Sequence, residues 1–169
     1  MAETQDFHPI RPVTVTWRGF DIQIAALERP YFEAAAQGRL IVQVCDECGT
    51  ARYPVADRCP NCGSRDWDWQ ESAGRGTVHS CLVIEHSVRP EQLPAPYTTG
   101  LTELDDHVND LRKGGRQPVR ILTNVYEPDG ETFVAEPPPD GTPVEVFFEA
   151  IGDGFAVPQF KLVEGSAAA

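Results

Sequence analysis

Four cysteines in two Cys-x-x-Cys-Gly pairs constrain this chain more than any other part of its sequence. Cys45 and Cys48 form the first pair, and Cys59 and Cys62 form the second, after a spacer that runs from Gly49 to Arg58. Each Cys-x-x-Cys turn directs two sulfurs toward one centre, so two such turns supply the tetrahedral set of four thiolates that zinc prefers. The spacing predicts a ribbon closed around one metal ion, with zinc as the first choice and iron as the alternative.

The predicted metal site is structural rather than catalytic, because four cysteine ligands leave no open position for water or substrate. Two disulfides are the alternative use of four cysteines. Met1 to Pro12 contains no apolar run, so we expect no signal peptide. No stretch approaches the roughly eighteen apolar residues that a membrane span needs, so we expect no membrane partner. These features favour the cytoplasm, where thiols stay reduced and bind metal.

The N-terminal arm, residues 1–28, contains a predicted hairpin. Thr14–Trp17 and Phe20–Ile24 alternate in polarity around Arg18 and Gly19, as two paired strands do. An isolated hairpin is marginal in water. We therefore expect this one to lie either on the rest of the chain or on a partner, with a disordered arm as the alternative.

The segment 29–73 is predicted to hold a short helix followed by the metal ribbon. The helix is expected to begin at Pro30, which suits a first helical position, and to close at Gly38. Leu40–Val44 alternates as a strand that leads into the first cysteine pair. Tyr53–Val55 is expected to return antiparallel to it.

The segment 74–164 predicts a small β-barrel, because it contains five short strands and no long helical period. The 15 prolines of the chain suit short strands joined by rigid loops. A five-stranded barrel of the OB type is the expected architecture. Asp105–Gly115 is expected to be a polar loop, and residues 165–169 a disordered tail. The strands are expected at Thr77–His86, Thr98–Leu104, Val119–Tyr126, Val144–Glu149 and Phe155–Val163.

The charge of the chain argues against nucleic acid as a partner. There are 26 acidic and 14 basic residues, for a formal net charge of −12. Such a surface repels a phosphate backbone unless a local basic patch exists, and the sequence shows none. A nucleic-acid module nevertheless remains the alternative class, since zinc ribbons and OB barrels serve that role in other proteins.

No group of residues forms a convincing catalytic set, so we expect no catalytic residue in this chain. Cys81 lies in an apolar strand and is expected to be a small buried side chain, with His79 two residues away on the same face. Asp105, Asp106 and His107 could be drawn as an acid–base or metal cluster, but they lie in the expected polar loop.

The order of these elements resembles the DUF35 family, in which a rubredoxin-like zinc ribbon is fused to an OB fold. The resemblance covers residues 29–163. Its specific parts are the four cysteines and the Gly-Arg-Gly-Thr-Val run from Gly74 to Val78. The long arm and the Asp105–Gly115 segment depart from the expected family pattern.

The resemblance implies a function that the residues alone do not. Proteins of this family accompany thiolase-superfamily enzymes, including thiolases, acyltransferases and steroid side-chain aldolases, and some accompany hydratases. It therefore implies a non-catalytic subunit of an acyl-CoA enzyme complex, with a thiolase-superfamily protein as partner and a CoA thioester as substrate of the complex. Three arginines become candidate contacts for the CoA phosphates, with screening of the metal–thiolate charge or plain solubility as alternatives. These are Arg52, Arg58 and Arg65.

Overall fold

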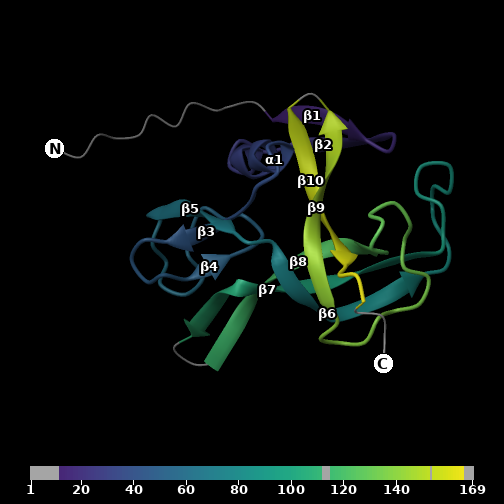
Figure 1. Cartoon of the computed structure of the whole chain (residues 1–169). Coiled ribbons are helices and arrows are strands. Elements are labelled where there is room, and N and C mark those ends of the chain that lie inside the picture. The colour runs from purple at the N-terminus through teal and green to yellow at the C-terminus, as the bar shows by residue number, and fades with distance from the viewer. Residues whose placement is uncertain (1–11, 112–114, 153, 166–169) are drawn as a thin grey trace.

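The structure is a computed structural model that describes residues 12–111, 115–152 and 154–165. Its described part contains one helix and three sheets (Figure 1): an N-terminal hairpin, a three-stranded ribbon and a closed barrel. The predicted class, a mainly β chain with a short helix, a zinc ribbon and five C-terminal strands, is confirmed. Most of the predicted tail, residues 166–169, lies outside the described residues.

The N-terminal hairpin forms where the sequence predicts it. Strands β1 (Val13–Trp17) and β2 (Phe20–Ile24) pair antiparallel. The two turn residues, Arg18 and Gly19, have φ values of 49° and 76°. Positive φ at both positions is the conformation whose twist suits a two-residue hairpin. Arginine tolerates this region poorly, so contacts of its side chain must hold Arg18 there.

The hairpin packs on the barrel of its own chain and not on a partner. Val15 and Ile24 are buried in a small core with Ile151 and Phe155, two residues of the barrel. Trp17 and Ile22 pack against the same cluster, so these side chains are engaged within the chain. The hairpin, residues 13–24, is thus part of the folded unit.

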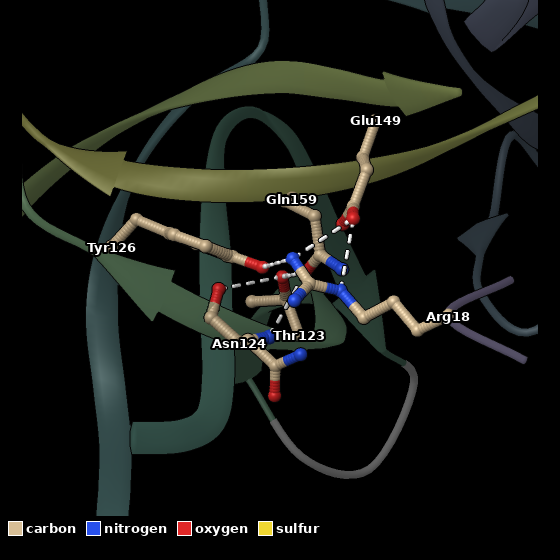
Figure 2. Close-up of polar contacts among 6 residues, drawn as sticks. All are labelled: Arg18, Thr123, Asn124, Tyr126, Glu149 and Gln159. Atoms are coloured by element: carbon tan, nitrogen blue, oxygen red, sulfur yellow. Dashed lines mark hydrogen bonds and ion pairs between the residues drawn. The ribbon is translucent and has the colours of Figure 1, made fainter. Parts of the chain in front are cut away.

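The side chain of Arg18 binds the hairpin turn to two barrel strands (Figure 2). Its Nε and Nη2 lie 3.0 and 2.9 Å from Glu149 Oε1, and Nη2 donates a 3.3 Å hydrogen bond to the Tyr126 hydroxyl. Desolvation raises the pKa of Tyr126 to about 12, so the phenol is a neutral partner at physiological pH. Gln159 accepts hydrogen bonds from Thr123 and Asn124 beside it and fixes the strand that carries Tyr126.

Replacing Arg18 with methionine should loosen the hairpin while leaving the barrel folded. The charged hydrogen bonds are partly exposed, so we expect a loss of about 1–2 kcal/mol of unfolding free energy. Limited proteolysis should show faster cleavage within residues 13–24, and denaturant unfolding should give the energy. Arg39→Met is the matched control, because its 3.6 Å ion pair with Glu71 is more exposed. Equal stability of both variants would contradict the role given to Arg18.

A short helix and a three-stranded sheet form the ribbon region. Helix α1 (Arg29–Ala36) has Pro30 in its first turn, and Gly38 follows it with a φ of 75°. Strand β3 (Leu40–Cys45) is buried along its whole length, between β4 (Ala51–Arg52) and β5 (Trp67–Ser72). No helix in the described part of the chain is long and apolar enough to cross a membrane.

Five strands close into a barrel in the order β10–β8–β7–β6–β9. The strands β8 and β10 run parallel, and the other pairs run antiparallel. This is the strand order of an OB fold, as the sequence predicts. Apolar residues from all five strands fill the interior, including Val78, Leu104, Ile121, Val144 and Phe160. The strands are β6 (Arg75–Ile84), β7 (Tyr97–Leu111), β8 (Gly115–Tyr126), β9 (Pro143–Gly152) and β10 (Phe155–Leu162).

Two glycines let the chain pass from the ribbon into the barrel. A Cβ atom on Gly74 would lie 2.1 Å from Val146 Cγ1, and one on Gly76 would lie 2.1 Å from the Glu103 carbonyl oxygen. Gly74 also has a φ of 69°, which other residues rarely adopt. The Gly-x-Gly spacing therefore reflects close backbone packing at the start of β6.

The prediction of a polar loop at Asp105–Gly115 is wrong. Strand β7 continues to Leu111 and β8 starts at Gly115, so the two strands extend beyond the barrel as a hairpin; residues 112–114 lie outside the described part. The Asn109 amide accepts from Ala51 N at 2.7 Å and donates to Ala51 O at 2.8 Å. The extension thus binds β4 of the ribbon, below the ribbon in Figure 1.

A second contact ties the same extension to the end of the ribbon. The Asp106 carboxylate accepts hydrogen bonds from the Ser72 hydroxyl at 2.9 Å and from Ala73 N at 2.6 Å. Although desolvation opposes it, the Ala73 N–H and the neighbouring His107 lower the pKa of Asp106. Its carboxylate is therefore a structural anchor between ribbon and barrel.

Candidate metal centre

The two cysteine pairs form two copies of one backbone turn. Gly49 N donates to Cys45 O at 2.8 Å, and Gly63 N donates to Cys59 O at 2.9 Å. The two glycines have φ values of 68° and 81°. A Cβ atom would meet nothing within 4 Å at either position, so glycine is needed for the backbone conformation and not for space.

The four sulfurs of the ribbon converge on one centre. All four lie within 4.8 Å of one another, and the pairs Cys45–Cys62 and Cys48–Cys59 are each separated by 3.6 Å. Four sulfurs at about 2.3 Å from a shared tetrahedral ion would be about 3.8 Å apart. The predicted ligand set therefore fits one tetrahedral metal ion. Two of the four residues, Cys45 and Cys59, are buried.

The electrostatics of the cluster also favour a cation. A backbone hydrogen bond from Ser64 favours the thiolate of Cys62, but desolvation and the three neighbouring sulfurs raise its pKa to about 12. A hydrogen bond from the Thr50 hydroxyl stabilises the thiolate of Cys48 and lowers the pKa of Cys48 to about 6. Four thiolates in this space repel one another, and a divalent ion at their centre relieves that repulsion.

Polar side chains contact the first cysteine pair from outside. Thr50 Oγ1 lies 3.1 Å from Cys48 Sγ, and the Asn61 amide lies 3.0 Å from Thr50 Oγ1 and 3.7 Å from the same sulfur. Sequence reasoning missed both residues. Their position between the cysteines is visible in the sequence, but single polar residues in a turn do not indicate which atoms they contact.

The three candidate arginines have different environments. Arg52 is buried: its Nε donates to Gln43 Oε1 at 3.0 Å, its Nη2 donates to Ala56 O at 3.1 Å, and its guanidinium lies over the Trp67 ring. This placement makes Arg52 a structural residue of the ribbon rather than a surface contact for phosphate. Arg58 and Arg65 are exposed, and Arg65 lies 3.5 Å from Asp57.

The expected return strand at Tyr53–Val55 is displaced toward the first cysteine pair. Strand β4 is Ala51–Arg52, paired with Val44 and Gln43. Thr50 O accepts from Cys45 N at 3.0 Å, so the turn closes directly after the cysteines and pairing starts at once.

Two tryptophans stand two residues apart on strand β5 of the ribbon. Trp67 and Trp69 pack edge to face at 5.4 Å and are both partly exposed. Trp69 also lines a groove of about 440 Å³ between α1 and the ribbon, together with Ala34, Ile41 and Glu71. The two tryptophan rings thus form an aromatic surface next to the groove between α1 and the ribbon.

The remaining candidates do not assemble into a catalytic set among the described residues. Cys81 packs against the core and contacts Pro138 O at 3.5 Å, whereas His79 reaches the Glu103 carboxylate at 3.2 Å. A bulge between Val78 and Ser80 interrupts the alternation, so the expectation that His79 and Cys81 share a face is wrong. Asp106 and His107 belong to the contact with the ribbon.

A four-cysteine ribbon joined to a five-stranded barrel defines a zinc-ribbon protein with an OB-type domain. The family model for the ChsH2 rubredoxin-like zinc ribbon domain matches residues 32–68. The solved structure called Ltp2-ChsH2(DUF35) aldolase is 33% identical, with a TM-score of 0.61, over 82% of this chain and 96% of that one. The chain belongs to the DUF35 family.

Two further relatives match the chain over shorter segments. A probable enoyl-CoA hydratase alpha subunit of Thermomonospora curvata is 46% identical over 76 residues, which are 45% of this chain and 24% of that protein. A DUF35 domain-containing scaffold protein of Methanocaldococcus jannaschii is 27% identical over 63 residues, 37% of this chain and 45% of that protein. The matches thus span less than half the length of these two relatives.

Proposed function

We propose that this chain is a non-catalytic subunit of an acyl-CoA enzyme complex, with a thiolase-superfamily protein as its partner. The observation that carries the proposal is its match, over most of both chains, to the DUF35 component of the structure called Ltp2-ChsH2(DUF35) aldolase. The similarity to a probable enoyl-CoA hydratase alpha subunit supports acyl-CoA chemistry in the complex. The substrate of the complex is a CoA thioester, and the partner supplies the reacting groups.

We propose zinc as the metal of the ribbon, held by Cys45, Cys48, Cys59 and Cys62. Four sulfurs within 4.8 Å of one another suit the tetrahedral geometry of zinc, and a closed ligand set suits a structural role. The ion supplies folding free energy to a ribbon whose strand β4 has only two residues. We place the protein in the cytoplasm, where the four thiols stay reduced and available to metal.

The surface offers candidate contacts for both partner and CoA. Trp67 and Trp69 are the aromatic side chains that we propose as partner anchors, since buried aromatic residues dominate stable interfaces. Arg58 and Arg65, both exposed, remain the proposed contacts for CoA phosphates. Arg52 is not proposed as a phosphate contact, because its guanidinium is buried within the ribbon.

The proposal is tested by mixing the purified chain with a thiolase-superfamily protein from the same source. Size-exclusion chromatography should show one larger species that contains both chains. In parallel, a fluorescence titration with single-stranded DNA at about 0.15 M salt should show negligible binding, because the net charge is −12. Separate elution of the two proteins together with tight, strongly salt-dependent DNA binding would establish the nucleic-acid alternative instead.

A further inference from the structure

A chain of hydrogen bonds links the two cysteine pairs of the ribbon through side chains. It starts at Asn61, between the two cysteines of the second pair, passes through the Thr50 hydroxyl and ends at Cys48 of the first pair. The Asn61 Nδ2–Thr50 Oγ1 distance is 3.0 Å, and the Thr50 Oγ1–Cys48 Sγ distance is 3.1 Å. The backbone of Thr50 is fixed as well, since its carbonyl accepts from Cys45 N.

The chemistry of the groups sets the direction of these hydrogen bonds. An amide –NH2 group can only donate, so the Thr50 oxygen accepts from Asn61. The hydroxyl hydrogen of Thr50 is then free to point at Cys48 Sγ, which as a thiolate can only accept. The opposite orientation of Asn61 would place its carbonyl oxygen toward the thiolate, which is repulsive, and would draw the Thr50 hydroxyl hydrogen away from Cys48. One orientation therefore satisfies all three groups.

The hydrogen bonds of Thr50 are shielded from water. Thr50 is only 6% exposed, so water does not compete freely for its hydroxyl. A hydrogen bond to a charged acceptor in such a place is stronger than one between neutral groups. The Asn61 amide also lies 3.7 Å from Cys48 Sγ, so both side chains direct donors toward one sulfur.

We propose that Thr50 and Asn61 are positioning residues of the metal site, which hold the Cys48 thiolate in place and slow the loss of the metal. By joining the first cysteine pair to the second, they also oppose the opening of the two turns that must precede release. The inference rests on the proposed metal in the ribbon and is independent of the proposed partner.

The test compares zinc release from the zinc-loaded full-length chain and its variants. Thr50→Val keeps the shape of the side chain and removes the hydroxyl, so transfer of zinc to an excess of a chromophoric chelator should be about 10- to 100-fold faster. Thr50→Ser restores the hydroxyl and should bring the rate back toward that of the wild type. Thr132→Val, which makes the same change in an exposed turn at Asp129, is the matched control.

A spectroscopic measurement separates positioning from general stability. In the cobalt-substituted protein, loss of a hydrogen bond to sulfur raises the energy of its lone pairs. The thiolate-to-cobalt charge-transfer band of Thr50→Val should therefore move to longer wavelength, and that of Thr50→Ser should not. Asn61→Ala should shift the band in the same direction by less, and it serves as the second variant if Thr50→Val does not fold.

Wild-type rates and an unshifted band in both Thr50→Val and Asn61→Ala would overturn the inference while leaving the metal in place. A wild-type chain that takes up neither zinc nor cobalt would overturn the metal proposal and this inference with it. The partner proposal survives either result.

Discussion

Removing the metal, or replacing Cys48 with serine, should unfold the ribbon and leave the barrel folded. Strand β4 of the ribbon has only two residues, and the four sulfurs of the two cysteine turns lie within 4.8 Å of one another, so metal binding contributes directly to the folding of the ribbon. Structural zinc sites of this type supply on the order of 10–16 kcal/mol in apparent binding free energy. The barrel shares one core with ribbon strand β3, but its five strands close on themselves around Phe160, which is 0% exposed, and they carry none of the four ligands, so we expect the barrel to stay folded.

Tryptophan fluorescence and elemental analysis check this prediction. The wild type should contain one zinc per chain, and Cys48→Ser should lose most of it. The emission of Trp67 and Trp69 should shift toward that of solvated indole in the variant. Cys81→Ser is the matched control, since Cys81 lies in the barrel, away from the ligand set. Freshly prepared, reduced wild-type protein without zinc or iron would refute the metal assignment.

Replacing Trp67 with alanine should weaken assembly with the partner by at least about 30-fold, which corresponds to about 2 kcal/mol. Trp67 and Trp69 are in ring contact and partly exposed, and Trp69 lines the groove between the ribbon and α1. Their intramolecular contacts leave ring area for a partner to bury, and aromatic anchors carry most of the energy of stable interfaces. The affinity of each variant for the partner is measured by calorimetry.

Two comparisons separate the loss of a partner contact from damage to the metal site. Trp67 also lies under the Arg52 guanidinium and pairs with Cys45, so its loss could disturb the metal site. Trp69→Ala, further along β5, should weaken binding as well, and the zinc content of both variants should stay at the wild-type level. Val88→Ala removes an apolar side chain that is 96% exposed and should leave the affinity unchanged. Wild-type affinity in both tryptophan variants would rule out this face as the interface.

The features that the sequence predicts correctly depend on local chemistry. Two Cys-x-x-Cys-Gly turns direct four sulfurs toward one centre, so the convergence of the four cysteines and the conformations of the two glycines follow from spacing alone. The N-terminal hairpin and the five barrel strands follow from alternating apolar residues bounded by glycine and proline. Strand order follows less directly, since it requires the family resemblance or a general preference for small closed barrels.

The features that the sequence does not predict depend on contacts between distant segments. Asp106 and Asn109 look like loop residues because they are polar, yet their side chains bind the backbone of Ala73 and Ala51. Polar residues at a contact between two sheets give no periodic signal. The role of Arg52 was missed for a similar reason, because its partner Gln43 is a buried polar residue that alternation does not mark.

Acyl-CoA turnover tests most directly the proposal that this chain serves a partner enzyme and does no chemistry itself. Rates are measured for the chain alone, for the thiolase-superfamily partner alone, and for the partner titrated with the chain. The proposal predicts no turnover by the chain alone and a rate that rises with added chain until the complex is saturated. Turnover by the isolated chain, or a partner rate that does not change at any ratio, would contradict it.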